Sequence, residues 1–285
     1  GHKWCNYWFH VHHLNTNSGK MSKSSGEFLT VSLLESKGYD PLVYRYFCLQ
    51  SHYRKSLVFS YENLDNAAIA YNKLVARLAQ LDTDDGELDE AAFAEGKKRF
   101  TDALDNDLNT SLAVTALYDV FKLNTNAKTK LALIEDFEKV MSLGLVEAAN
   151  KIKSMYKIIG ELESLGDSGE AIGRILKRKN VHGKVFDKPI LDRLNKIMDL
   201  VQKGYDVMIV NMKNPDLRNI SNAQNAEYNI NECRNHLREE HIVNIESNSY
   251  NYLTGVYFMD VLAELEKIGD FLINVSQAVV GKYER

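Results

Sequence analysis

The chain has 285 residues, 45% of them hydrophobic and 26% charged, so we expect a soluble globular protein with room for two domains. A formal net charge of −4 excludes an overall basic footprint for nucleic acid, although a local basic patch is compatible with it. The three cysteines form no CxxC pair and no apolar run approaches the roughly 20 residues of a membrane span, which favours a cytoplasmic protein without a disulfide framework.

The first residues, about 4–33, predict a mixed segment of short extended pieces. It opens on the aromatic run KWCNYWFH, whose large side chains (Trp4, Tyr7, Trp8 and Phe9) we expect in a core. True N-termini are usually exposed, so we expect the natural protein to extend upstream of Gly1.

Helices are predicted almost throughout after residue 40. Asp40 and Pro41 have the residue types of an N-cap and a first helical position, and apolar residues recur at helical spacing from there on. A turn is expected at 83–89, and Asn109 or Thr110 is expected to cap a later helix. The predicted helices lie near 41–50, 62–81, 89–105, 110–123, 128–143, 155–177, 188–212, 219–246 and 249–281.

The stretch GKMSKSSGEF, residues 19–28, has the composition of a mobile phosphate-binding loop. Lys20 and Lys23 place ammonium groups on flexible stems beside serines and Gly26, a combination that suits a triphosphate whose charge shifts during reaction. Taken alone, a solvated Lys/Ser turn is the better explanation of such a short motif.

Its neighbours favour the functional reading. The runs NYWFH, KMSKS, RYFCLQSHYRKSLVFS and DNDLNTSLAVTALYD together resemble cysteinyl-tRNA synthetase, a class I enzyme, over about 145 residues. The resemblance implies ATP-dependent charging of tRNA with cysteine. It implies ATP contacts at Lys20, Met21, Ser22, Lys23 and Ser24, with Lys23 foremost. It also makes residues 1–60 a remnant of the catalytic region and 61–150 a helical bundle that contacts the tRNA stem.

Several family features are absent from these residues. Ser25, Glu27 and Val58 depart from the family's usual Leu, Asn and Asn, and the charge of Glu27 is expected to weaken ATP binding. No HIGH-type motif occurs, and the family's zinc ligands lie upstream of this segment. Because one loop cannot orient cysteine against ATP, we predict no catalytic residues and no aminoacylation by this chain alone. His10, His12 and His13 are read as packing or loop residues in preference to a metal site.

A repeat marks the second half of the chain. ELESLGD begins at Glu161 and ELEKIGD at Glu264, 103 positions later (264 − 161), each within an apolar helical context. The pairs Glu163/Asp167 and Glu266/Asp270 stand four residues apart, on one helix face, where unpaired like charges repel. Hard oxygen ligands for a cation and a solvated acidic face are equally good explanations.

Residues 152–281 resemble the PhoU family, and most closely the cytoplasmic tail of sodium/phosphate cotransporter-type proteins. The runs YKIIGELESLGDSGEAIGRIL, NINECRNHLREEHI and YNYLTGVYFMDVLAELEKIGDFLINVSQAV carry this resemblance. It implies regulation of phosphate uptake, a membrane transport partner, and a divalent or trivalent metal at Glu163, Asp167, Glu266 and Asp270. It makes 151–285 a partial PhoU-like bundle, with two helices of the first repeat absent.

The predicted fold class is therefore mainly α: a short mixed α/β segment, a helical bundle, and a second, PhoU-like bundle. The two resemblances meet near residue 150 without a Pro/Gly linker, which raises the possibility of a joined sequence. Three hypotheses follow. The chain is a synthetase segment with an appended regulatory domain, or only its PhoU-like part functions as a metal-binding regulator, or it is a chimeric chain with no function of its own.

Overall fold

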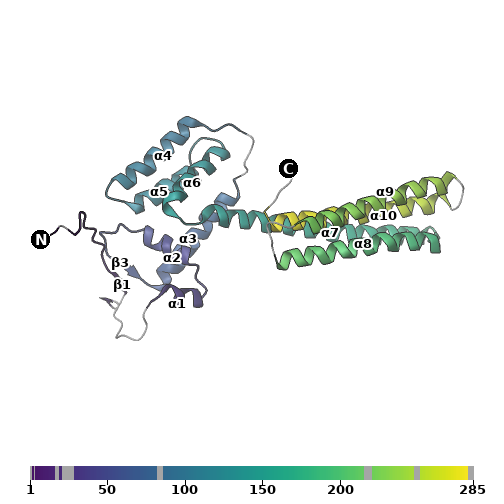
Figure 1. Ribbon diagram of the computed structural model, residues 1–285, viewed down its shortest axis with the longest axis horizontal. Coiled ribbons are helices and arrows are strands. Elements are labelled where there is room, and N and C mark those ends of the chain that lie inside the picture. The colour runs from purple at the N-terminus through teal and green to yellow at the C-terminus, as the bar shows by residue number, and fades with distance from the viewer. Residues whose placement is uncertain are drawn as a thin grey trace. The chain divides into compact units, whose positions relative to one another are not determined.

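The computed structural model describes residues 2, 4–16, 19–20, 29–81, 86–214, 220–246 and 251–281 (Figure 1). The described chain is mainly helical, as predicted, and divides into two compact units, Gly1–Asn150 and Lys151–Arg285. Its elements are β1 (Leu14–Thr16), β2 (Gly19–Lys20), α1 (Val31–Ser36), α2 (Pro41–Leu49), β3 (Leu57–Phe59), α3 (Tyr61–Ala79), α4 (Glu90–Asp105), α5 (Thr110–Val120), α6 (Ala127–Met141), α7 (Leu145–Val181), α8 (Lys188–Lys213), α9 (Ser221–Glu246) and α10 (Tyr252–Val279).

A small sheet lies in the first unit. Its strand order is β2-β1-β3, with β1 antiparallel to β2 and parallel to β3. Asn15 in β1 faces Val58 in β3, and its side-chain amide donates a 2.8 Å hydrogen bond to the Ser56 hydroxyl. The sheet therefore ties the strand before the KMSKS motif to the chain that enters α3.

Side-chain caps start the helices of the first unit. The Asp40 carboxylate accepts from the Leu42 N–H at 2.7 Å with Pro41 at the first position, and Asn109 caps α5 through the Leu112 N–H. Both caps confirm the sequence predictions. Each satisfies a backbone donor that the first helical turn leaves without a partner, typically worth about 1 kcal/mol.

The core of this unit is drawn from α2 to α7. Phe100 and Phe137 stack with ring centroids 4.1 Å apart, joining α4 to α6, and the hydroxyls of Tyr46 and Tyr118 lie 2.8 Å apart, joining α2 to α5. Fully buried side chains around them include Leu64, Leu74, Leu117, Leu133, Ile134 and Leu145. Burial of such side chains is the main stabilising contribution to the unit.

The prediction that the N-terminal aromatic residues form a core is wrong. Trp4 is 82% exposed, Tyr7 90%, Trp8 66% and Phe9 59%. Residues 7–13 run outside any helix or strand, and the His12 N–H bonds to the Tyr53 carbonyl. Of the four rings, Phe9 stacks on Tyr53 and Trp4 packs edge-on against Trp8, which leaves their remaining surface in solvent.

The helix predicted at 155–177 is longer than expected. α6 ends at Met141, and its C-cap Ser142 is in a left-handed conformation (φ 49°). Gly144 follows with φ 66°, and α7 then runs without a break from Leu145 to Val181. Good helix formers fill residues 145–157, so nothing in the sequence delays the helix until 155.

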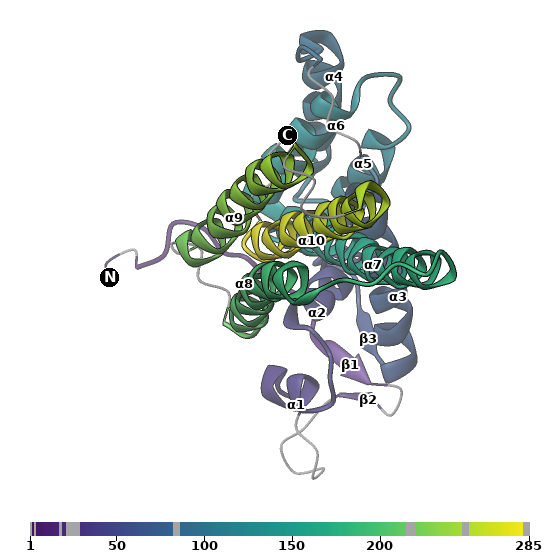
Figure 2. The same ribbon diagram turned by 90° about the vertical axis from the view of Figure 1, so that its right-hand side faces the viewer.

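In the second unit α10 lies between α7 and the α8–α9 pair, as the end-on view shows (Figure 2). Two polar contacts join α7 to α10: the Ser168 hydroxyl donates to Glu264 at 2.9 Å, and the Asn274 amide donates to Glu161 at 3.1 Å. Both carboxylates belong to the repeated ELES/ELEK runs, so this part of the repeat serves helix pairing.

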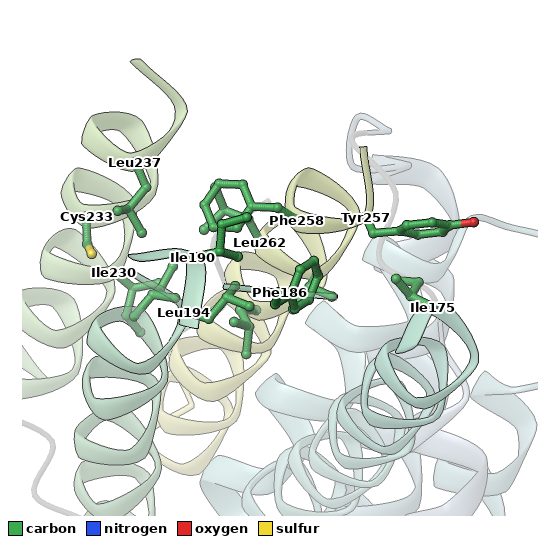
Figure 3. Close-up of a cluster of buried hydrophobic side chains, with 13 residues drawn as sticks. Ile175, Phe186, Ile190, Leu194, Ile230, Cys233, Leu237, Tyr257, Phe258 and Leu262 are labelled. Atoms are coloured by element: carbon green, nitrogen blue, oxygen red, sulfur yellow. The ribbon is translucent and has the colours of Figure 1, made fainter. Parts of the chain in front are cut away.

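A hydrophobic cluster fills one end of this unit (Figure 3). It combines side chains of α7, α8, α9 and α10 with Phe186 from the turn between α7 and α8; the labelled members include Ile175, Ile190, Leu194, Ile230, Leu237, Phe258 and Leu262. Across the described ranges no helix combines the length and apolarity needed to cross a membrane.

Candidate functional site

The predicted ATP contacts lie mostly outside the described residues. Lys20 ends β2, with its side chain not described, while Met21, Ser22, Lys23 and Ser24 fall in the undescribed range 21–28. The strand β1, which precedes them in the chain, is described.

Tyr53 anchors that strand. Its carbonyl accepts the His12 N–H at 3.0 Å, and its ring stacks on Phe9 with centroids 4.4 Å apart. Its hydroxyl donates to Oδ1 of Asp107 at 2.6 Å. Tyr53 therefore connects the segment before β1 with the turn before α5, 54 positions away in sequence.

Asp107 is held from several sides. Arg54 donates from Nε to Oδ2 at 2.6 Å and from Nη2 to Oδ1 at 3.1 Å, and His52 donates from Nε2 to the Asp107 carbonyl at 3.0 Å. The hydrogen bonds from Arg54, then from Tyr53, lower the pKa of Asp107 to about 2. Asp107 and Leu108 both have positive φ, 56° and 51°, a conformation that non-glycine residues rarely adopt.

A cavity of about 290 Å³ lies beside this cluster, lined by Val11, His12, Leu14, Tyr44, Cys48, Leu49, Ser51, His52, Tyr53, Lys55, Leu57 and Thr110. Burial, followed by the neighbouring Cys48, raises the pKa of Tyr44 to about 12. Burial also raises the pKa of the Cys48 thiol, so at neutral pH this cysteine is protonated and unsuited to nucleophilic chemistry.

A second hollow, of about 510 Å³, follows α3. Lys73 and Arg77 stand four residues apart on its wall, both exposed, with Asn66, Ile69, Ala70, Ala76, Gln80 and Tyr118 as the other lining residues. None of these lining residues is acidic. Like charges at this spacing repel each other unless a counter-charge binds, so the hollow suits a phosphate-bearing ligand.

The four predicted metal ligands lie in the second unit. Glu163 and Asp167 are exposed on α7, while Glu266 on α10 forms an ion pair with Arg234 of α9. Burial, and then the charge of Glu266, raise the pKa of Asp270, against a lowering by Arg234.

These positions do not make up a three-ligand site. Within the described ranges, no three His, Cys, Asp or Glu side chains gather closely enough to hold a metal ion. His10, His12 and His13 are all exposed, and they too form no such group with other described residues. Metal binding at the two carboxylate pairs stays a prediction.

Sequence reasoning missed the Arg54–Asp107 cluster. Asp107 and Arg54 stand inside the runs DNDLN and SHYRKS, but nothing in either run shows that the two segments meet. The one local signal is the density of Asn and Asp at 105–109, because these residues tolerate the left-handed region better than others.

The similarities to known proteins cover most of the first unit and part of α7. The model of the class I (C) tRNA synthetase catalytic domain matches residues 1–69, and the DALR domain model matches residues 99–166. The DALR match continues past residue 150, the end that the sequence resemblance predicts.

Curated relatives agree with these models. A cysteine–tRNA ligase of Burkholderia lata is 40% identical over 148 residues, which cover 52% of this chain and 30% of that protein. The cysteine–tRNA ligase of Novosphingobium aromaticivorans is 41% identical over 144 residues (49% and 29%), and that of Borrelia garinii subsp. bavariensis is 37% identical over 172 (55% and 35%). The matched part of the chain spans about a third of the length of these relatives. The matched residues are thus similar to a segment of cysteine–tRNA ligases.

Proposed function

We propose that the first unit binds ATP through Lys20–Ser24 and tRNA through its helices, as a segment of a cysteine–tRNA ligase. The match of residues 1–69 to the synthetase catalytic domain carries this proposal, because the KMSKS motif lies inside it. The curated relatives are named as cysteine–tRNA ligases, which act on tRNA, and the basic hollow of α3 suits a phosphate backbone.

Lys73 and Arg77 give the tRNA part a direct test. Fluorescence anisotropy with labelled tRNA would compare the wild-type chain with Lys73→Ala/Arg77→Ala. We expect weaker binding and a shallower salt dependence, with the log–log slope reduced by about one for each phosphate that the variant no longer neutralises. The matched control is Lys98→Gln/Lys122→Gln, which removes two charges already paired with Asp102 and Asp119. Equal decreases in affinity in both double variants would contradict a specific role for the hollow.

Catalysis is a separate question. The 285 residues contain the KMSKS motif and no HIGH-type motif. Activation requires ATP and cysteine to be oriented against each other, and only one of the two ATP motifs is present to do this. We therefore propose that this chain alone gives no cysteine-dependent exchange of pyrophosphate into ATP. Exchange above background with pure protein would overturn that statement while leaving the binding proposal intact.

The second unit offers metal-dependent regulation of phosphate transport as a second candidate. The observation that favours a cation there is that Glu266 and Asp270 stand four residues apart on one face of α10, where the charge of Glu266 adds to the effect of burial in raising the pKa of Asp270. Because Arg234 already pairs with Glu266, Arg234→Met should strengthen Mn²⁺ binding, and Glu266→Gln should abolish it. Glu170→Gln, at an exposed pair with Arg174, is the control. Calorimetric Mn²⁺ titrations that are alike for all four proteins would rule out this pair as ligands.

A further inference from the structure

The hydrogen bonds around Asp107 lie at a solvent-exposed position, where they contribute little to stability. The Arg54 and Asp107 side chains are 63% and 47% exposed, and an ion pair in such a position contributes little to folding. Yet the Asp107 carboxylate accepts three hydrogen bonds from Tyr53 and Arg54. What these contacts determine is the relative position of two chain segments.

The backbone at this point is also unfavourable. A leucine with φ 51° costs about 1–2 kcal/mol relative to a right-handed conformation, and Leu108 adopts it directly after Asp107 at φ 56°. Strained residues of this kind persist where the surroundings over-determine them, and they concentrate at functional positions. Here the surroundings are the His52, Tyr53 and Arg54 side chains.

Contacts continue from Tyr53 to the sheet. The His12 N–H bonds to the Tyr53 carbonyl, and β1 begins two residues later at Leu14. On the other side, the Thr110 hydroxyl donates to the Ser51 carbonyl at 3.2 Å, so the start of α5 holds the same loop. A continuous series of contacts thus joins α5 to the strand that leads into the KMSKS motif.

We propose that Asp107 is a positioning residue for nucleotide binding: through Tyr53 it sets the place of β1 and, because β1 pairs with β2, the place of Lys20, where the KMSKS motif begins. This inference rests on the proposed function of that motif. It assigns to the helical part of the unit an influence on ATP affinity, although Asp107 itself does not touch the nucleotide.

The test measures ATP dissociation constants for Asp107→Ala, Asp107→Asn, Tyr53→Phe and the double variant Asp107→Ala/Tyr53→Phe. We expect each of Asp107→Ala and Tyr53→Phe to weaken ATP binding by about fivefold or more, the lower end of typical coupling between sites. The double variant should bind ATP no more weakly than the more weakly binding of the two single variants, because both substitutions remove the same hydrogen bond between Tyr53 and Asp107. Asp107→Asn keeps an oxygen acceptor for Tyr53 and should fall between Asp107→Ala and the wild type.

Asp102→Asn is the matched control, since Asp102 pairs with Lys98 on the exposed face of α4 and should leave ATP affinity unchanged. Hydrogen exchange of residues 9–16, measured without ATP, is the second readout. Asp107→Ala should accelerate it, with α4 and α6 exchanging as in the wild type. Unchanged exchange, or wild-type ATP affinity in Asp107→Ala, would overturn the positioning role. A wild-type chain that binds no ATP would instead refute the proposed function, and the exchange result would still decide whether Asp107 positions β1.

Discussion

The hydroxyl of Tyr71 in α3 donates a 2.8 Å hydrogen bond to the carbonyl of Leu143, in the turn between α6 and α7, and both residues are buried. Burial raises the pKa of this phenol to about 12, with smaller contributions from Asp40, Glu138 and Glu147. The bond thus connects α3 to the turn that precedes α7.

Removing this hydroxyl tests how much the connection stabilises the unit. Tyr71→Phe leaves a buried carbonyl without its donor, so we expect the free energy of unfolding to fall by about 1–3 kcal/mol. Native-state hydrogen exchange of the α3 amides measures this for the first unit alone. Tyr7 is 90% exposed, so Tyr7→Phe should change the free energy of exchange of the same amides by less than about 0.5 kcal/mol. Equal effects of the two substitutions would contradict the assignment.

Leu108 allows the cost of the left-handed turn to be measured. Glycine adopts a φ of 51° without steric cost but loses more entropy on folding, by about 0.5–1 kcal/mol. Since the strain on leucine is about 1–2 kcal/mol, Leu108→Gly should be more stable than Leu108→Ala by about 0.5–1 kcal/mol. Urea unfolding of the two variants gives the difference directly. An alanine variant as stable as the glycine variant would show that the turn carries no strain.

The two copies of the repeat provide a matched pair of glycines. A Cβ at Gly166 in α7 would meet nothing within 4 Å, whereas one at Gly269 in α10 would lie 3.1 Å from Cγ2 and Cδ1 of Ile230. Gly166→Ala should therefore stabilise the second unit by the helix-propensity difference, about 0.8–1 kcal/mol. Gly269→Ala should gain nothing or destabilise, because Ile230 is buried and has little room to move. Thermal unfolding that ranks the two variants in the opposite order would contradict this packing.

His241 predicts the pH dependence of the second unit. Burial, then the charge of Arg193, lower its pKa below the ordinary 6.5. As the pH falls through about 6.5, the unfolded chain binds a proton that the folded chain does not, so stability decreases until the lower folded pKa is passed. The unfolding midpoint should drop between pH 7.5 and 5.5, and the drop should be smaller in His241→Gln. If His241→Gln kept the wild-type pH dependence, another group would be responsible for the drop in the unfolding midpoint.

Much of the fold could be predicted from the sequence because its signals are local. Asp40 with Pro41 and the Asn109 cap predict helix starts correctly, and helical periodicity predicts nearly all the long helices. The errors arise where the outcome depends on the surroundings. Trp4 and Tyr7 have core-type side chains but no layer of described residues over them, and apolarity alone does not reveal that.

The candidate sites show the same division. KMSKS can be identified from the sequence because its residues are consecutive. The contact between Arg54 and Asp107 joins positions 53 residues apart, and the side-chain contact of Glu266 with Arg234 is likewise set by helix packing. The spacing of two carboxylates four residues apart correctly predicts that they share a helix face. It does not show that one of them, Glu266, already forms an ion pair with Arg234 of another helix.

The most direct measurement for the proposed function is the equilibrium binding of ATP to the 285-residue chain and to Lys23→Ala, with Lys98→Ala as a control far from the motif in sequence. We predict saturable binding by the wild type and by Lys98→Ala, and at least a tenfold weakening in Lys23→Ala, about 1.4 kcal/mol. Equal affinities in all three proteins would place ATP elsewhere, and the absence of ATP binding in the wild type would contradict the central claim.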